Sequence, residues 1–190
     1  MAKLYFRYSA MNAGKSTALL QVAHNYGEHG RAVWIYTSAL DHRFGVGIVT
    51  SRLGPRRRAT TFDDATDFYA EIAGAGEDLA CVLVDEAQFL TPGQVRQLHR
   101  VAHVLGVPVI CYGIRSDFLG EPFPGSAYLL TLADSVEELK TVCACGKKAT
   151  MNVRIDERGK RITEGAQIAI EGDARYIQQC GACFYTDALR

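Results

Sequence analysis

A loop near the start of the chain, Ser-Ala-Met-Asn-Ala-Gly-Lys-Ser at residues 9–16, constrains the fold most strongly. It follows an apolar, strand-like run at residues 4–8 and precedes a helical pattern at residues 15–26. Strand, small-residue loop, Gly-Lys-Ser and helix, in that order, are typical of the loop that binds the phosphates of a nucleoside triphosphate. The alternative is an ordinary strand–turn–helix connection that carries Gly-Lys-Ser by chance.

Each part of this loop has a physical reason to bind phosphate. Backbone N–H groups of a tight loop and of the first helical turn point into one concavity, which accepts oxygen anions. Gly14 lets the backbone approach phosphate, Lys15 would reach the β- and γ-phosphates, and the Ser16 hydroxyl would be a ligand of Mg²⁺. Ser9 stands where the motif usually has glycine. The residues predicted to bind ATP and Mg²⁺ here are Ser9, Ala10, Met11, Asn12, Ala13, Gly14, Lys15 and Ser16.

Two adjacent acids follow a second buried strand. The apolar run at residues 79–84 ends at Asp85 and Glu86. Asp85 would belong to the ligand shell of Mg²⁺, on the side opposite Ser16. Glu86 would then be free to remove a proton from the attacking group. The pair predicts phosphoryl transfer without deciding whether water or an alcohol attacks. The alternative is that two acids end a strand in solvent.

Strand and helix patterns alternate over the first three quarters of the chain. Strand-like runs are expected at residues 4–8, 32–37, 79–84, 107–112 and 136–142. Helices are expected at 15–26, at 62–73 with Asp63 or Asp64 as N-cap, from the Thr91 cap to Gly106, and at 126–132. This alternation predicts an α/β fold with a mainly parallel sheet and helices on both faces.

The alternation of strand and helix ends near Thr141, where we expect a domain boundary. Residues 1–141 would form the nucleotide-binding domain and residues 142–190 a second, smaller one. In the second domain helical periodicity fades, and short β-like runs occur at 151–155 and 167–170.

Residues 38–55 have no periodicity, and three consecutive arginines follow at 56–58. Such a charged run is either a solvated segment or one that closes over a triphosphate. Asp41 and Arg43 are the candidates for the second role, because they lie just beyond the carboxyl end of a strand, where ligands bind in open α/β sheets.

Four cysteines form two close pairs, Cys143 with Cys145 and Cys180 with Cys183. Four thiolates in tetrahedral array form a closed structural zinc site. Free or disulfide-paired cysteines are the alternative. The other two, Cys81 and Cys111, lie in strand-like runs and are expected to be buried.

The zinc would hold both ends of the loop at residues 146–179, so that the loop can lie over a pocket. Backbone groups of its 168–176 stretch could read the polar edge of a flat ring. Aromatic side chains could line the same pocket or belong to the core, and the candidates are Phe89, Phe118, Phe123 and Tyr176.

The charge balance and the hydropathy of the sequence limit which class of protein it can belong to. The 190 residues include 21 basic and 21 acidic ones, and this balance argues against a dedicated nucleic-acid binder. We find neither a signal-peptide pattern nor an apolar run long enough to span a membrane. A cytoplasmic enzyme without a stable nucleic-acid partner is therefore expected.

Together, these motifs resemble type II thymidine kinases over essentially the whole chain. The resemblance rests on the residues 9–16 loop, Asp-His-Arg at 41–43, Asp-Glu-Ala-Gln-Phe at 85–89, Asp117-Phe118 with Phe123, the two cysteine pairs and Arg175-Tyr176. It implies a RecA-like α/β domain, a zinc domain with a "lasso" loop over the nucleoside, and transfer of the ATP γ-phosphate to the 5′-hydroxyl of thymidine or deoxyuridine.

The resemblance also implies roles for single residues. By match to the family motif, Glu86 would be the general base, and Asp85 and Gln88 would be among the residues that bind ATP and Mg²⁺. The thymidine pocket would contain Met11, Phe89, Phe118, Phe123 and Tyr176. Main-chain groups would read the base at Ile168, Ala169, Ile170, Glu171 and Gly172, with Glu171 standing where many relatives have glycine. The family is usually tetrameric and is inhibited by dTTP.

Two other hypotheses share part of this pattern. A RecA- or helicase-like ATPase stimulated by nucleic acid would use the same loop and acid pair with water as the attacker, although most such motors need a second core domain or a ring. A zinc module that binds nucleotide only as a folding or switching ligand would show no turnover.

Overall fold

The structure is a computed structural model that describes residues 1–41, 45–76, 78–168 and 175–186. Its centre is a six-stranded sheet in which every neighbouring pair is parallel, as the alternating pattern predicted. The strands lie in the order β5 (Thr60–Phe62), β2 (Ala32–Ser38), β6 (Leu79–Val84), β7 (Val109–Gly113), β1 (Leu4–Tyr8) and β8 (Ser135–Glu138).

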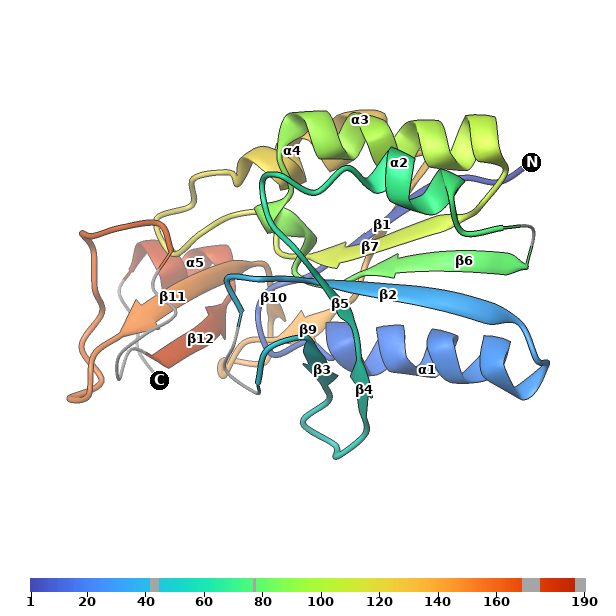
Figure 1. Ribbon diagram of the computed structural model, residues 1–190. Helices are drawn as coiled ribbons and strands as arrows, with labels where there is room; N and C mark the ends of the chain where they lie inside the picture. Colours follow the sequence, from blue (N-terminus) through green and yellow to red (C-terminus); the bar gives the residue numbers. More distant parts are fainter. Residues whose placement is uncertain (42–44, 77, 169–174, 187–190) are drawn as a thin grey trace.

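Helices cover both faces of this sheet (Figure 1). Helix α1 (Lys15–Glu28) lies on one face, and α2 (Phe68–Ala73), α3 (Pro92–Arg100) and α4 (Pro124–Leu132) lie on the other. Neighbouring residues of β6 point to opposite faces of the sheet, so that Leu83 packs in the core under α1 and Val84 packs in the core on the other face. Burial on both faces explains why β6 is a continuous apolar run.

The parallel arrangement brings the carboxyl ends of β1, β6 and β7 to one edge of the sheet. The phosphate loop follows β1, the acid pair follows β6, and β7 lies between these two strands. The Ser9 N–H donates to the Gly113 carbonyl over 3.3 Å, which fixes the loop against the end of β7. Open α/β sheets bind their ligands at such an edge.

The helix predicted at residues 62–73 is wrong in its first half. Phe62 is buried at the end of β5, where it lies opposite Ser38, and helix α2 begins only at Phe68. Its N-cap is Asp67, whose carboxylate accepts the Ala70 N–H over 3.0 Å, so neither Asp63 nor Asp64 has this role. Burial of an aromatic side chain in the sheet overrides local helix propensity here.

Two other predictions need correction. The segment expected to be irregular contains an antiparallel hairpin, in which β3 (Ile48–Thr50) pairs with β4 (Arg56–Arg58), so the three arginines form an exposed strand. The strand expected at 136–142 is divided into β8 and β9 (Thr141–Val142). The helix expected from Thr91 to Gly106 is confirmed as α3 followed by the π-helical turn η2 (Val101–Leu105).

The cysteine-rich segment adds two small antiparallel pairs and a short helix. Strand β9 pairs with β10 (Lys148–Ala149), β11 (Met151–Ile155) pairs with β12 (Arg175–Gln179), and α5 (Gly181–Tyr185) follows. Of the β-like run expected at 167–170, residues 167 and 168 lie outside any strand, and the rest lies outside the described residues. Strand β12 was not predicted.

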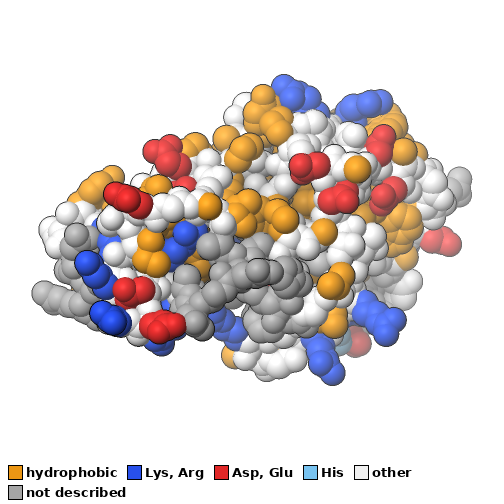
Figure 2. Space-filling model, turned by 60° about the vertical axis from the view of Figure 1, so that its left-hand side comes forward, with side chains coloured by type: hydrophobic (Ala, Val, Ile, Leu, Met, Phe, Trp, Pro, Cys, Tyr) orange, Lys and Arg blue, Asp and Glu red, His pale blue; other side chains and the backbone are white. Residues whose placement is uncertain are grey.

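The surface mixes both signs of charge. Figure 2 turns the molecule so that the cysteine-rich part comes forward, and basic and acidic side chains are interspersed over this face, in keeping with 21 residues of each kind. Within the described ranges, no helix has the length and apolar character needed to cross a membrane.

Gly125 sets how closely α4 approaches the turn after the acid pair. That turn is the short 3₁₀ helix η1 (Ala87–Phe89). A Cβ atom at Gly125 would lie 2.6 Å from the Leu90 carbonyl oxygen and 2.8 Å from that of Gln88. These contacts involve backbone atoms, so relief would require α4 or η1 to move.

We therefore expect Gly125→Ala to lower the free energy of unfolding by about 1–3 kcal/mol, the usual cost of overpacking. Gly93→Ala is the matched control, because Gly93 lies in α3 with its nearest contact at an ordinary 3.8 Å, and alanine favours a helix. Urea unfolding of both variants measures the difference. Equal stability of the two variants would contradict the close contact.

Candidate functional site

The loop after β1 has the geometry of an anion cradle. Gly14 has φ +81° and Asn12 has φ +61°, left-handed conformations that both residue types tolerate. Helix α1 begins directly afterwards at Lys15 and has no acidic residue in its first turn. Its first N–H groups and its dipole therefore face the loop and favour a negatively charged ligand.

Ser9 explains how the loop works without its usual glycine. Ser9 has no positive φ, so this position does not require glycine. Its side chain accepts a hydrogen bond from Lys15 Nζ over 3.0 Å, and Lys15 also donates to the Ala10 carbonyl over 3.0 Å. The ammonium group is thus folded back over the loop, where it adds positive charge to the cradle.

Ser16 and Asp85 meet across the sheet edge, as the sequence predicted. Ser16 Oγ donates to Asp85 Oδ2 over 2.9 Å, and the Asp85 side chain is only 4 % exposed. Burial, together with the charge of Glu86, raises the pKa of Asp85 to about 7. A hydroxyl and a carboxylate are the oxygen ligands that Mg²⁺ prefers, so the pair fits this ion.

Glu86 stands in a constrained backbone conformation. Its φ is +51° and its ψ is +38°, which is unusual for a residue with a long side chain and occurs most often at functional sites. Gln88 Nε2 donates to the Glu86 carboxylate, and Gln88 Oε1 accepts the Ile114 N–H over 3.2 Å. Gln88 therefore anchors the Glu86 carboxylate to the segment after β7.

One cavity of about 430 Å³ connects the phosphate cradle with the aromatic side chains. It brings together fourteen of the predicted site residues, namely Met11, Asn12, Ala13, Gly14, Lys15, Ser16, Asp41, Glu86, Gln88, Phe89, Phe118, Phe123, Ile168 and Tyr176. Ser9, Ala10 and Asp85 are buried and do not line the cavity. The predicted residues Arg43, Ala169, Ile170, Glu171 and Gly172 lie outside the described residues.

The aromatic end of the cavity is well ordered by packing. The rings of Phe89 and Phe123 meet edge to face with centroids 5.9 Å apart. Phe118 and Phe123 are 1 % and 4 % exposed, so both belong to the cavity wall and to the core at once. The sequence left open whether these aromatic side chains line the pocket or belong to the core, and Phe118 and Phe123 do both.

Arg154 was not predicted from the sequence, yet it supports this wall. Its guanidinium lies 3.9 Å from the centre of the Phe118 ring. It donates to the Tyr176 hydroxyl over 2.8 Å and to the Gln167 carbonyl over 3.2 Å. Gln167 and Tyr176 precede and follow residues 169–174 in the sequence, so Arg154 connects the two described segments that flank those residues with the pocket.

Asn152 was also missed, and it joins the cysteine-rich segment to the phosphate loop. Its Oδ1 accepts the Met11 N–H over 2.7 Å, and its Nδ2 donates to the Ser116 carbonyl over 2.9 Å. Asn152 and Arg154 lie two residues apart on β11 and so share a face of that strand. The sequence held no signal for this role, because polar residues at alternate positions of a strand are typical of a solvent-facing side, whereas both residues are buried here.

Other side chains that line the cavity were not predicted as site residues. They are Thr17, Thr50, Ser51, Arg52, Leu53, Ile114, Asp117 and Gln167. Several come from the β3–β4 hairpin, which the sequence pattern did not reveal. Gln167 Nε2 donates to Asp117 Oδ2 over 3.1 Å, which joins the segment before residue 169 to the cavity wall.

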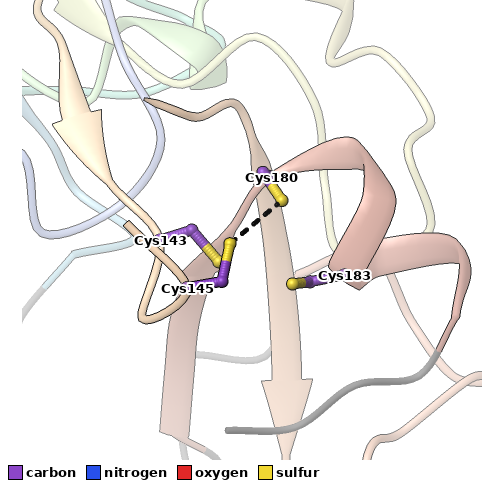
Figure 3. Close-up of side chains that lie close together, drawn as sticks. All are labelled: Cys143, Cys145, Cys180 and Cys183. Carbon is purple, nitrogen blue, oxygen red and sulfur yellow. Dashed lines mark hydrogen bonds between the residues drawn. The ribbon is translucent and has the colours of Figure 1, made fainter. Parts of the chain in front are cut away.

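The four predicted cysteines gather into one cluster (Figure 3). Cys143 and Cys145 come from the turn between β9 and β10, Cys180 follows β12, and Cys183 lies on α5. All four sulfur atoms lie within 4.8 Å of one another, with those of Cys145 and Cys180 3.6 Å apart. Sulfur atoms in tetrahedral array around Zn²⁺ are about 3.8 Å apart, so the cluster fits this ion.

The four thiol groups shift one another's pKa values in opposite directions. Backbone N–H groups of Cys145 and Cys180 lower the pKa of Cys143 to about 6, which favours its thiolate. Hydrogen bonds to Cys145 and Cys180 raise the pKa of Cys183 to about 12, because a further negative charge among the sulfur atoms is unfavourable without a cation. A divalent metal ion would remove that penalty.

The family model and the similar proteins that we compared with this chain indicate the same family. Residues 2–184 match the family described as thymidine kinase. The chain is 60% identical to a thymidine kinase from Chromobacterium violaceum over 187 residues, covering 98% of this chain and 100% of that one. It is 58% identical to one from Albidiferax ferrireducens, with 99% and 94% covered, and 54% identical to one from Vibrio vulnificus, with 100% and 99% covered.

Among solved structures, Pif1 helicase from Candida albicans matches with a TM-score of 0.43 and 12% identity, over 75% of this chain and 37% of that one. A likeness of this extent carries no argument about fold or function.

We expect purified protein to hold one zinc ion per chain and Cys145→Ser to lose it, because a serine hydroxyl does not replace a thiolate ligand. Metal analysis after dialysis measures this. Cys81→Ala is the control, because Cys81 is buried under α1 and should leave the zinc content unchanged. Equal zinc content in wild type and Cys145→Ser would show that the cluster does not bind the ion.

Proposed function

We propose that this chain, which belongs to the thymidine kinase family, transfers the γ-phosphate of ATP to the 5′-hydroxyl of thymidine and of deoxyuridine. The observation that carries the proposal is the single cavity of about 430 Å³ in which the phosphate cradle, Glu86 and the aromatic wall meet. A hydrolase needs only the cradle and a water molecule, whereas a nucleoside kinase also needs room for a flat base next to the transferred phosphate.

The phosphate end of the cavity would bind the triphosphate of ATP. The N–H groups at the start of α1 hold the phosphate oxygens, and Lys15 would turn from Ser9 toward the β- and γ-phosphates. Ser16 and Asp85 would hold Mg²⁺, which when bound neutralises charge on the phosphates. Phosphoryl transfer depends mainly on such positioning and charge neutralisation.

Glu86 would take the proton of the 5′-hydroxyl as its oxygen attacks the γ-phosphate. Glu86 lines the same cavity as the cradle and the aromatic wall, and the hydrogen bond donated by Gln88 holds its carboxylate. A positioned base of this kind contributes about 10²–10⁴-fold to the rate. The same base could serve water, so the nucleoside pocket decides the acceptor.

The aromatic wall would receive the thymine ring. One face of Phe118 is covered by Arg154, so the base would contact the side of the wall that faces the cavity, next to Phe89 and Met11. Backbone groups at residues 168–172 would read the polar edge of the base, a proposal that rests on the family resemblance. A lasso fastened at both ends by Arg154 would reduce the entropy lost when the nucleoside binds.

Further properties of the family are proposed here for this chain. They are a structural rather than catalytic role for the zinc ion, a tetrameric assembly, inhibition by dTTP and a cytoplasmic location. A boundary between the nucleotide-binding part and the zinc-binding part near Thr141 is proposed with them. Four thiolate ligands would leave the zinc ion no position for a catalytic water molecule.

An assay with ATP, Mg²⁺ and each of the four deoxynucleosides tests the proposed reaction most broadly. We expect monophosphate formation with thymidine and far less with deoxyadenosine, deoxyguanosine or deoxycytidine. ATP hydrolysis stimulated by single-stranded DNA, without any nucleoside phosphorylation, would instead support the helicase-like hypothesis.

We expect Glu86→Gln to lower kcat for thymidine by about 10²–10⁴-fold with little change in ATP affinity, because the amide cannot accept the proton. Steady-state kinetics and equilibrium binding of an ATP analogue measure the two effects. Glu28→Gln is the control, because Glu28 is exposed at the end of α1. Retained turnover in Glu86→Gln would exclude Glu86 as the base.

We expect Arg154→Met to raise KM for thymidine by about tenfold while KM for ATP changes by less than about threefold. Arg154 contacts Phe118, Tyr176 and Gln167 at the nucleoside end of the cavity, so its loss should affect thymidine binding more than ATP binding. The expected size follows from the loss of a charged hydrogen bond, which contributes about 1.5–3 kcal/mol. Arg96→Met is the matched control, because Arg96 lies 4.8 Å from the Tyr128 ring between α3 and α4, away from the cavity. A parallel rise in both KM values would contradict a role limited to the nucleoside end.

A further inference from the structure

Two histidines and an aspartate converge at the edge of the sheet opposite the catalytic cavity. His99 lies in the last turn of α3, His103 lies one helical turn later in η2, and Asp134 lies between α4 and β8. The Asp134 N–H donates to the Leu4 carbonyl over 2.9 Å at the start of β1. Strand β1 runs from this point to the phosphate loop, so the cluster and the cavity lie at opposite ends of the strand.

The spacing of the two histidines suits a shared ligand. Residues i and i+4 lie on the same side of a helix, and two histidines at this spacing are a common pair of ligands for zinc. The two imidazole rings lie with their centroids 4.4 Å apart. They converge on each other rather than pointing apart into solvent.

The donor atoms are close enough to bind one ion. One ring nitrogen of each histidine and one oxygen of Asp134 lie within 4.8 Å of one another. His103 Nε2 lies 3.0 Å from Asp134 Oδ2 and 3.1 Å from Oδ1. Ligand atoms about 2.0–2.2 Å from a tetrahedral zinc ion stand about 3.3–3.6 Å apart, so side-chain rotations that draw the three donor atoms together would complete the site.

Asp134 is held in place by a backbone group. Its Oδ2 accepts the Leu4 N–H over 2.8 Å, which fixes the carboxylate while both of its oxygens face His103 Nε2. Metal-binding side chains in proteins usually have such outer hydrogen bonds, which orient the ligand before the ion arrives.

We propose that His99, His103 and Asp134 form a second metal site, distinct from the four-cysteine cluster, for a divalent first-row transition ion such as Zn²⁺. Two imidazoles select such ions over Mg²⁺ and Ca²⁺, which prefer oxygen ligands. His103 and Asp134 are exposed, so water would complete the coordination. The ion would join the end of α3 to the start of β1 and to the connection between α4 and β8.

The position favours a cation for a further reason. Both histidines lie near the C-terminal end of the helical segment formed by α3 and η2, where the carbonyl groups and the helix dipole attract positive charge. The competing explanation is that His103 and Asp134 form only a surface ion pair at this helix end. The two explanations differ in their need for His99, which makes no direct hydrogen bond in such a pair.

Calorimetric titration with ZnCl₂ at pH 7.5 tests the site, using full-length protein whose zinc content has been measured beforehand. We expect one equivalent of Zn²⁺ to bind beyond the starting content, and His99→Gln to weaken that binding by at least about tenfold, since even loss of an outer partner of a ligand costs about 10–100-fold. His24→Gln is the control, because His24 and Glu28 form an exposed i, i+4 pair 3.9 Å apart on another helix.

Two further measurements keep the test decisive. Asp134→Asn removes the ligand charge while its amide oxygen can still accept the Leu4 N–H, so it should fold and bind Zn²⁺ weakly. Zn²⁺ should raise the melting temperature of the wild-type protein and of His24→Gln more than that of His99→Gln. Equal Zn²⁺ affinity in wild type and His99→Gln, or no binding beyond the starting content, would overturn the proposal and leave a surface ion pair only. Neither result depends on kinase activity.

Discussion

The hydrogen bond from Ser16 to Asp85, 2.9 Å long, joins the two halves of the phosphate site. It forms because β1 and β6 are parallel and both end at the same edge of the sheet, with β7 between them. This contact sets the distance between the phosphate cradle and the acid pair. Burial and the charge of Glu86 raise the pKa of Asp85 to about 7, and a bound cation would favour its ionised form.

A second set of contacts brings the cysteine-rich segment to this edge. Asn152 accepts the Met11 N–H, and Arg154 contacts Phe118 and Tyr176. Both residues come from β11, whose position depends on its pairing with β12 and thus on the segment that the four cysteines enclose. Because Cys180 directly follows β12, the four-cysteine cluster lies at one end of the strand pair from which the two polar side chains reach the cavity.

The sequence allowed the phosphate loop, the acid pair and the cysteine cluster to be predicted, because each depends on local spacing that survives in any context. It did not allow Arg154 or Asn152 to be predicted, because their roles arise only when β11 pairs with β12 and faces Phe118. Phe62 was misassigned for a similar reason, since its burial in β5 depends on pairing with β2. Long-range pairing, rather than residue chemistry, is what the sequence pattern failed to reveal.

A crystal structure of the protein with thymidine, Mg²⁺ and a non-hydrolysable ATP analogue would show whether the phosphate cradle, Glu86 and the aromatic wall act on one nucleoside. We expect the Glu86 carboxylate to lie within hydrogen-bonding distance of the 5′-hydroxyl, about 2.6–3.2 Å, with the γ-phosphate on the other side of that oxygen. This expectation would be contradicted by a thymidine ring bound away from Phe118, or by a Glu86 carboxylate that points away from the nucleoside.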